Sequence, residues 1–213
     1  MATLDELLDN MKQCEAKGDL GGIVKLRARI ARDFPNTPEA AEALFRLGVY
    51  LLFIENQPDA AKQTFEDAIK IKDPNWSKAA RVSLASLYLR EQKTQKALLE
   101  LRKALGEKDP PSIHTVSALS IMEAIHEEAG SSADVRNTKE EKVRHLNVLV
   151  QQSREAKDDG ALAFFLFSLA QEQFALGMPA IAKNLLQEII GMGAQRAGQG
   201  LVNQTQGLLK QIG

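Results

Sequence analysis

The sequence contains little of what several functional classes require. It has one cysteine, Cys14, so no disulfide can form within the chain, and nothing favours an oxidising compartment. Its 27 Lys and Arg residues nearly balance its 28 Asp and Glu residues, which gives no overall attraction for nucleic acid or for an anionic membrane. The single cysteine argues against a secreted scaffold held together by disulfides, and the balanced charge argues against a nucleic-acid-binding protein.

Long apolar runs are also missing. The most apolar stretch, "ALAFFLFSLA" at residues 161–170, has about half of the ~20 residues that a membrane-spanning helix needs. The first residues, "MATLDELLDNMKQ", carry acidic side chains where a signal peptide carries basic ones. We therefore expect a cytoplasmic protein without a membrane span.

What the chain does contain is a helical pattern. Aromatic residues make up only 5%, and the apolar content is dominated by Ala and Leu, which favour helices. No window alternates apolar and polar residues as a half-buried strand does. Helix starts are indicated at Thr37-Pro38 and Thr94, and a capping box is indicated at residues 138–141. The proline, glycine and capping residues between the helical stretches predict about eleven helices in antiparallel pairs.

Small residues recur at a fixed interval within these pairs. In "LASLYLREQKTQKALLELRKAL", residues 84–105, Ala85 and Ala97 are twelve positions apart, and Ala170 and Ala182 repeat the spacing. A third copy, residues 47–69, is one residue longer between its halves. Small side chains at these positions let two helices approach closely, with large neighbours filling the flanking grooves. Hairpins of this kind stack into a solenoid because one pair cannot bury both of its faces.

The pattern resembles the tetratricopeptide repeat. Its small and large positions are matched closely at residues 84–110 and, less fully, at residues 47–74 and 169–186. The stretch "FPNTPEAAEALFRLG", residues 34–48, looks like the repeats of bacterial envelope-assembly members of the family. The resemblance implies an all-α, right-handed superhelix of about five helix hairpins and a capping helix.

We expect one solenoid domain over residues 1–213. Its predicted repeats are residues 4–37, 38–74, 75–110, a divergent and enlarged repeat at 112–158, and 160–193, followed by a capping helix at 195–213. The polar segment "SSADVRN", residues 131–137, is expected to separate the two helices of the divergent repeat.

No motif predicts catalysis, a metal or a cofactor. His114, His126 and His145 lie on different predicted elements and lack metal-ligand spacing. The glycine-rich stretch at residues 191–200 follows a helix and lacks the third glycine of a phosphate-binding loop. Basic residues in "KLRARIARD", residues 25–33, fit a solvated helix face better than an acidic-partner site. The chain is therefore not expected to be an enzyme, although a metal site in the divergent repeat is the rival interpretation.

The resemblance implies a partner-binding concave surface made by the first helix of each repeat. Several phenylalanines fall on it, which favours an apolar peptide or amphipathic helix of another protein as ligand. The expected function is that of an adaptor, scaffold or chaperone; the alternatives are a self-associating homo-oligomer, a groove filled by the C-terminal helix, or phenylalanines that belong to the core. The implied partner-binding residues are Phe45, Val49, Leu52, Phe53, Val82, Leu89, Arg90, Phe164, Phe167, Gln171 and Phe174.

Overall fold

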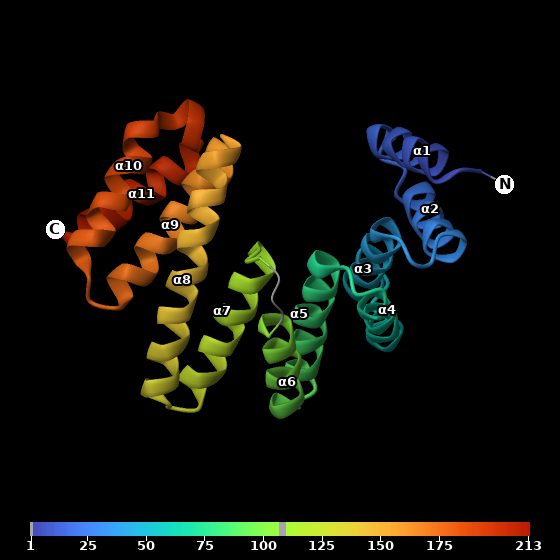
Figure 1. Ribbon diagram of the computed structural model, residues 1–213, viewed down its shortest axis with the longest axis horizontal. Coiled ribbons are helices and arrows are strands. Elements are labelled where there is room, and N and C mark those ends of the chain that lie inside the picture. The colour runs from blue at the N-terminus through green and yellow to red at the C-terminus, as the bar shows by residue number, and fades with distance from the viewer. Residues whose placement is uncertain (1, 107–109) are drawn as a thin grey trace. The chain divides into compact units, whose positions relative to one another are not determined.

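The described chain folds into a succession of α-helices. The computed structural model describes residues 2–106 and 110–213, which divide into two compact units, unit 1 within residues 1–109 and unit 2 within residues 110–213. The described part contains eleven α-helices and no strand, which confirms the all-α class and the predicted succession of hairpins (Figure 1). Residues 107–109, at the end of the third predicted repeat, lie outside the described residues.

Unit 1 consists of three helix hairpins. Its six helices are α1 (Leu4–Lys17), α2 (Leu20–Asp33), α3 (Pro38–Phe53), α4 (Pro58–Lys70), α5 (Pro74–Arg90) and α6 (Thr94–Leu105). Proline occupies the first turn of α3, α4 and α5, where its missing N–H costs nothing. Thr37 and Asp73 cap α3 and α5 by accepting hydrogen bonds from backbone N–H groups of the first turn. Thr94 makes no such cap, because α6 already begins at that residue.

The small residues of unit 1 lie where the hairpin helices meet. Ala85, Ala97 and Ala61 are fully buried, and a Cβ atom built on Gly48 would lie 2.5 Å from the Phe65 ring. Phe65 is itself fully buried among Leu52, Leu84 and their neighbours. The predicted close approach of paired helices is confirmed by these contacts.

Unit 2 contains five helices. They are α7 (Ile113–Glu128), α8 (Ser132–Ala156), α9 (Asp159–Ala175), α10 (Pro179–Ala197) and α11 (Gln199–Ile212). Helix α8 has 25 residues, because it begins at Ser132 and runs through the segment that the sequence assigned to a connection. The capping box predicted at residues 138–141 is therefore wrong: Thr138 is inside α8 and donates its hydroxyl proton to the Asp134 carbonyl.

The end of the chain closes the core of unit 2. Helix α10 is broken at Gly193, whose φ of 71° is available to glycine at little cost, and α11 then packs on α10 and α9. Val202 and Thr205 of α11 are buried, and Leu201, Leu208, Leu209 and Ile212 pack against the same cluster as Leu186 and Ile189. The C-terminal helix is therefore a cover for the last hairpin.

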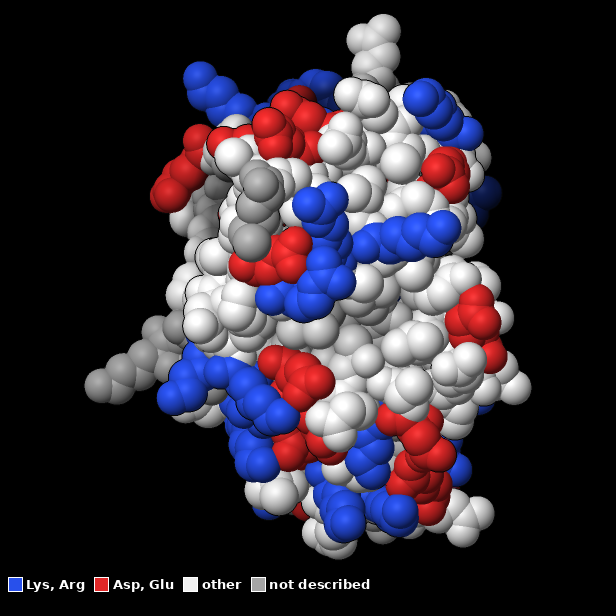
Figure 2. All heavy atoms as spheres, turned by 90° about the vertical axis from the view of Figure 1, so that its right-hand side faces the viewer, with Lys and Arg blue, Asp and Glu red and all other residues white. Residues whose placement is uncertain are grey.

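No helix within residues 2–106 and 110–213 has both the length and the apolar content to cross a bilayer. The face drawn in Figure 2 carries Lys and Arg side chains interspersed with Asp and Glu. On α2, Arg29 and Arg32 both pair with Asp33, as expected of a solvated helix face.

Candidate functional site: the groove between α7 and α9

Helices α7 and α9 leave a groove between them. Both pack on α8, but they do not pack directly on each other, whereas the corresponding helices of unit 1, α3 and α5, do. The groove therefore has α7 and α9 as its walls and α8 as its floor.

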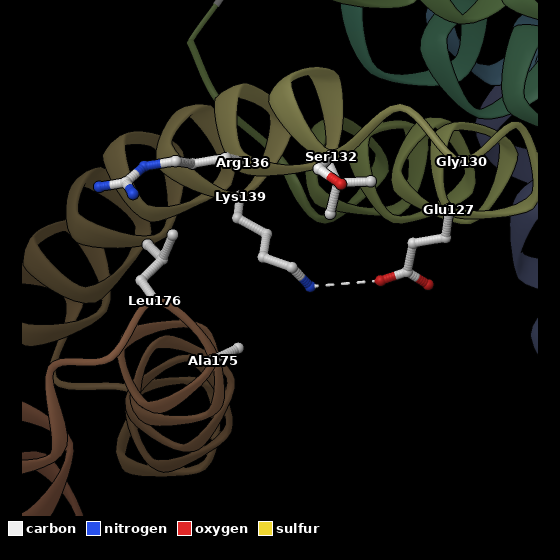
Figure 3. Close-up of a pocket in the computed structure, with 8 residues that line it drawn as sticks. Glu127, Gly130, Ser132, Arg136, Lys139, Ala175 and Leu176 are labelled. Carbon is white, nitrogen blue, oxygen red and sulfur yellow. Dashed lines mark ion pairs between the residues drawn. The ribbon is translucent and has the colours of Figure 1, made fainter.

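Two cavities lie along this α7–α9 groove. The first cavity has a volume of about 430 Å³ and lies beside the first half of α7 and the middle of α9. The second cavity, of about 400 Å³, lies beside the α7–α8 turn and the end of α9 (Figure 3). Both volumes fall in the range of ligand-binding clefts. The first cavity is lined by Ile113, Val116, Ser117, Ser120, Ile121, Lys142, Leu146, Phe164, Ser168, Gln171 and Glu172.

The wall residues of the first cavity are mainly apolar or hydroxyl-bearing. Phe164 is 47% exposed and Ile113 is 40% exposed, so each leaves a large apolar side chain at the surface. Ser117 and Ser168 donate hydrogen bonds to the carbonyls of Ile113 and Phe164, one turn earlier in their own helices. Their oxygens consequently remain available as acceptors toward the groove.

The floor of the groove carries a chain of ion pairs that is largely buried except at Glu127. It runs Glu127–Lys139–Glu123–Lys142–Glu172 and is called here the charged ladder. Lys142 on α8 is only 5% exposed, and its Nζ lies 2.7 Å from Glu172 Oε1 and 3.3 Å from Ser120 Oγ. The ladder therefore ties α7, α8 and α9 together between the two cavities.

The ladder also meets the second cavity. Lys139 Nζ points toward Glu127 Oε1 at 3.6 Å, whereas Arg136 extends away from this pair (Figure 3). Arg136 pairs instead with Glu140 on its own helix. One end of the ladder thus lies at each cavity, Glu172 at the first and Glu127 at the second.

Burial and pairing act in opposite directions on the ionisation of the ladder. Burial alone would raise the pKa of Glu123, but the hydrogen bonds from Lys139 and Lys142 outweigh it and leave this pKa below its usual value. Burial alone would lower the pKa of Lys139, and the hydrogen bond and charge of Glu123 outweigh it and raise this pKa. The charged forms of both residues are therefore favoured in the folded protein.

The implied partner-binding residues of unit 2 divide between this groove and the core. Phe164 and Gln171 line the first cavity. Phe174 is 37% exposed without lining either cavity, and Phe167 is half-buried against the core of unit 2. The groove thus contains two of the four residues implied for this part of the chain.

The residues implied in unit 1 form no comparable cavity in its described part. Leu52 is buried in the core cluster, and Val49 packs against the same cluster. The Phe45 ring lies 6.0 Å from that of Phe65 and 5.4 Å from that of Trp76, which makes it a packing residue. The other implied residues range from the half-buried Val82 and Leu89 to the exposed Arg90 and Phe53.

Unit 1 has a different hollow that the sequence did not predict. It has a volume of about 390 Å³ and lies between α2 and α3, with a mostly apolar lining that includes Val24, Leu44, Leu47 and Leu51. The hollow does not include any of the implied residues. It remains a second concave surface of this unit.

The histidines of the divergent repeat do not come together as a metal site. His126 lies beside Asp134 at 4.0 Å and His145 lies beside Glu141 at 3.8 Å. In the described part of the chain, no group of three or more His, Cys, Asp or Glu side chains is arranged to hold a metal ion.

The ladder was missed by reasoning from the sequence. Lys139, Lys142 and Glu172 stand among polar residues of predicted helices, and Glu123 interrupts an apolar stretch. A charged side chain on a helix ordinarily faces solvent. The available signal was the spacing of Lys139 and Lys142, which places both on the face of α8 that also carries the buried Leu146 and Leu149.

Comparison with known proteins supports the repeat. Residues 41–75, which cover most of α3, all of α4 and the start of α5, match the tetratricopeptide repeat family. Two crystal structures of MamA are each 16% identical to the chain and cover 87% of it, with TM-scores of 0.46 and 0.47 and with 95% and 88% of their own chains covered. A tetratricopeptide repeat protein from Parabacteroides merdae ATCC 43184 is also 16% identical, covers 98% of each chain and has a TM-score of 0.41. No curated protein matches the sequence significantly.

The matched stretch and the hairpins packed around it indicate a helical-repeat fold. Residues 41–75 thus match the family to which the small-residue spacing pointed. Helical repeats of this kind present extended surfaces to other proteins, so the fold is that of a protein–protein interaction module.

Proposed function

We propose that the protein is an adaptor or scaffold that holds an apolar helix or extended segment of a partner protein in the α7–α9 groove. The observation that carries the proposal is the exposure of Phe164 and Ile113 at a cavity whose floor is ordered by buried ion pairs. Large apolar side chains at the rim of a concave site are the usual anchors for a peptide ligand.

The groove is also suited to this task by its rigidity. Lys142 holds α7 through Ser120 and Glu123, and holds α9 through Glu172. A surface whose walls are fixed before binding loses less conformational entropy when a ligand docks. The tail helix α11 packs on α10 and α9 and does not line either cavity, so it leaves the groove open.

The test compares two substitutions in unit 2. Phe164→Glu places a charge in the first cavity, and Val148→Glu places the same charge at a position on α8 that is 42% exposed and lines neither cavity. Proteins captured from the source cells by the wild-type chain are quantified by mass spectrometry for all three forms. We expect a set of partners that Phe164→Glu loses and Val148→Glu keeps.

A photoreactive amino acid at Gln171 then identifies the contact. Crosslinks from this position to an apolar segment of the same partner would support the proposal. Retention of every partner by Phe164→Glu would refute it. A dimer that light scattering detects in the wild type and that Phe164→Glu dissociates would instead identify a second copy of the chain as the occupant.

A further inference from the structure

The first cavity of the α7–α9 groove lies at one end of the charged ladder. The ladder contains three carboxylates, Glu123, Glu127 and Glu172, and two ammonium groups, Lys139 and Lys142, which leaves a formal charge of one negative unit. Among the described residues, Lys142 and Glu172 are the charged ones that line the first cavity. These two charges are opposite in sign, so the ligand preference of this cavity depends on which of its polar atoms lack a partner.

At the first cavity, Glu172 has fewer hydrogen-bond partners than Glu123. Its Oε1 pairs with Lys142, whereas its Oε2 makes no hydrogen bond with any protein group in the described part of the chain. Glu123, by comparison, accepts from both lysines. The terminal torsion of a glutamate side chain is soft, so the carboxylate can turn its second oxygen toward a donor that enters the cavity.

The uncharged groups of the cavity also favour a donor. The hydroxyl protons of Ser117 and Ser168 are committed to helix carbonyls, so these side chains offer acceptor oxygens. The exposed Phe164 ring packs edge-on against Phe165, with 5.4 Å between ring centroids. An aromatic face of this kind attracts a cation and can cover the aliphatic stem of a lysine or arginine side chain.

We propose that the α7–α9 groove selects a partner segment that inserts one lysine or arginine side chain, flanked by apolar residues, into the first cavity. The basic group pairs with Glu172, its stem lies on Phe164, and the apolar neighbours contact Ile113 and Val116. This inference rests on the proposed function and adds the chemistry of the ligand.

The experiment selects a randomised peptide library, displayed on phage, against the full-length protein. The same selection is run on Glu172→Gln, and on Glu155→Gln as a matched control, because Glu155 is an exposed α8 carboxylate that lines neither cavity. We expect the wild type and Glu155→Gln to enrich a basic residue between apolar residues, and we expect Glu172→Gln to lose this preference.

Affinities of one selected peptide and its norleucine counterpart complete the test. Glu172→Gln should weaken the basic peptide about tenfold and change the norleucine peptide less than about twofold. Glu172→Asp, which keeps the carboxylate, should keep the preference, and circular dichroism verifies that each variant is folded.

The outcomes separate the two proposals. Selected peptides without a basic residue, or an unchanged preference in a folded Glu172→Gln, would overturn the charge selectivity alone. A library that yields no binder of the wild type, or binders whose affinity Phe164→Glu leaves unaltered, would overturn the groove itself.

Discussion

The Nζ of Lys142 on α8 lies 2.7 Å from Glu172 Oε1 on α9, and both side chains are largely buried. A lysine ammonium and a carboxylate in such a setting are each costly without the other. The pair therefore fixes how α9 lies on α8, and the wall of the groove that carries Phe164 and Gln171 depends on it.

Removal of one member of this pair should destabilise unit 2. Lys142→Met leaves Glu172 buried without a counterion, and we expect a loss of about 3 kcal/mol in the free energy of unfolding. The double variant Lys142→Met, Glu172→Leu replaces the whole pair and should recover most of that loss. Urea denaturation followed by circular dichroism measures both, and hydrogen exchange shows whether α8 and α9 lose protection. A single variant as stable as the wild type would contradict this account.

The ladder should give unit 2 a defined range of pH stability. The folded pKa of Glu123 is below its ordinary value of about 4.3, so its contribution is present above that pH and is lost as the pH falls through the folded pKa. The folded pKa of Lys139 is raised above about 10.4, so its contribution is present below that pH and is lost as the pH rises through the folded pKa. The free energy of unfolding should be measured across and beyond this pH range for the wild type and for Glu123→Gln. We expect it to fall less steeply with acidification in Glu123→Gln than in the wild type. If the stability of the two proteins fell equally with acidification, Glu123 would be excluded as a source of the pH dependence.

The close contact in the second hairpin of unit 1 should be sensitive to one methyl group. Gly48→Ala places a Cβ atom 2.5 Å from Cε1 of the buried Phe65, and overpacking of this kind costs about 1–3 kcal/mol. The gain in helix propensity, about 1 kcal/mol, does not fully offset it. Gly207→Ala is the matched control, because its Cβ meets no atom within 4 Å in α11, and it should stabilise the protein. Thermal melting distinguishes the two, and a Gly48→Ala variant that melts higher than the wild type would contradict the packing argument.

The phenylalanines implied as partner-binding residues should separate into two groups. Phe45→Glu and Phe167→Glu insert a charge into packed surroundings and should each cost about 3 kcal/mol or more. Phe53→Glu should change stability by less than about 0.5 kcal/mol, because Phe53 is 71% exposed. The emission of Trp76, the single tryptophan, should respond to Phe45→Glu but not to Phe53→Glu. Equal stability of all three variants would make Phe45 and Phe167 surface residues.

Much of the fold could be predicted because its determinants are local. Thr37-Pro38 sets a helix start through a side-chain cap and a proline in the first turn, and the interval between Ala85 and Ala97 is fixed by the geometry of one hairpin. The start of α8 could not be predicted in this way. The segment at residues 131–137 is polar and resembles a connection, yet it becomes the first turns of a long helix.

The candidate site was predictable only in part. Phe164 and Gln171 follow from their positions in a repeat, whereas Leu52, which was implied in the groove, is buried in the core cluster of unit 1. The ladder forms because the packing of three helices brings their charged side chains into contact. Periodicity within one helix contains no information about that contact.

The ladder also constrains how this surface can change over evolutionary time. Since Lys142 is the ladder partner of Glu172 and also pairs with Glu123, a substitution of Lys142 leaves the largely buried Glu172 without a counterion. A change at Lys142 must therefore be accompanied by a change at Glu172, so descendants of this chain should keep these two residues together or exchange both.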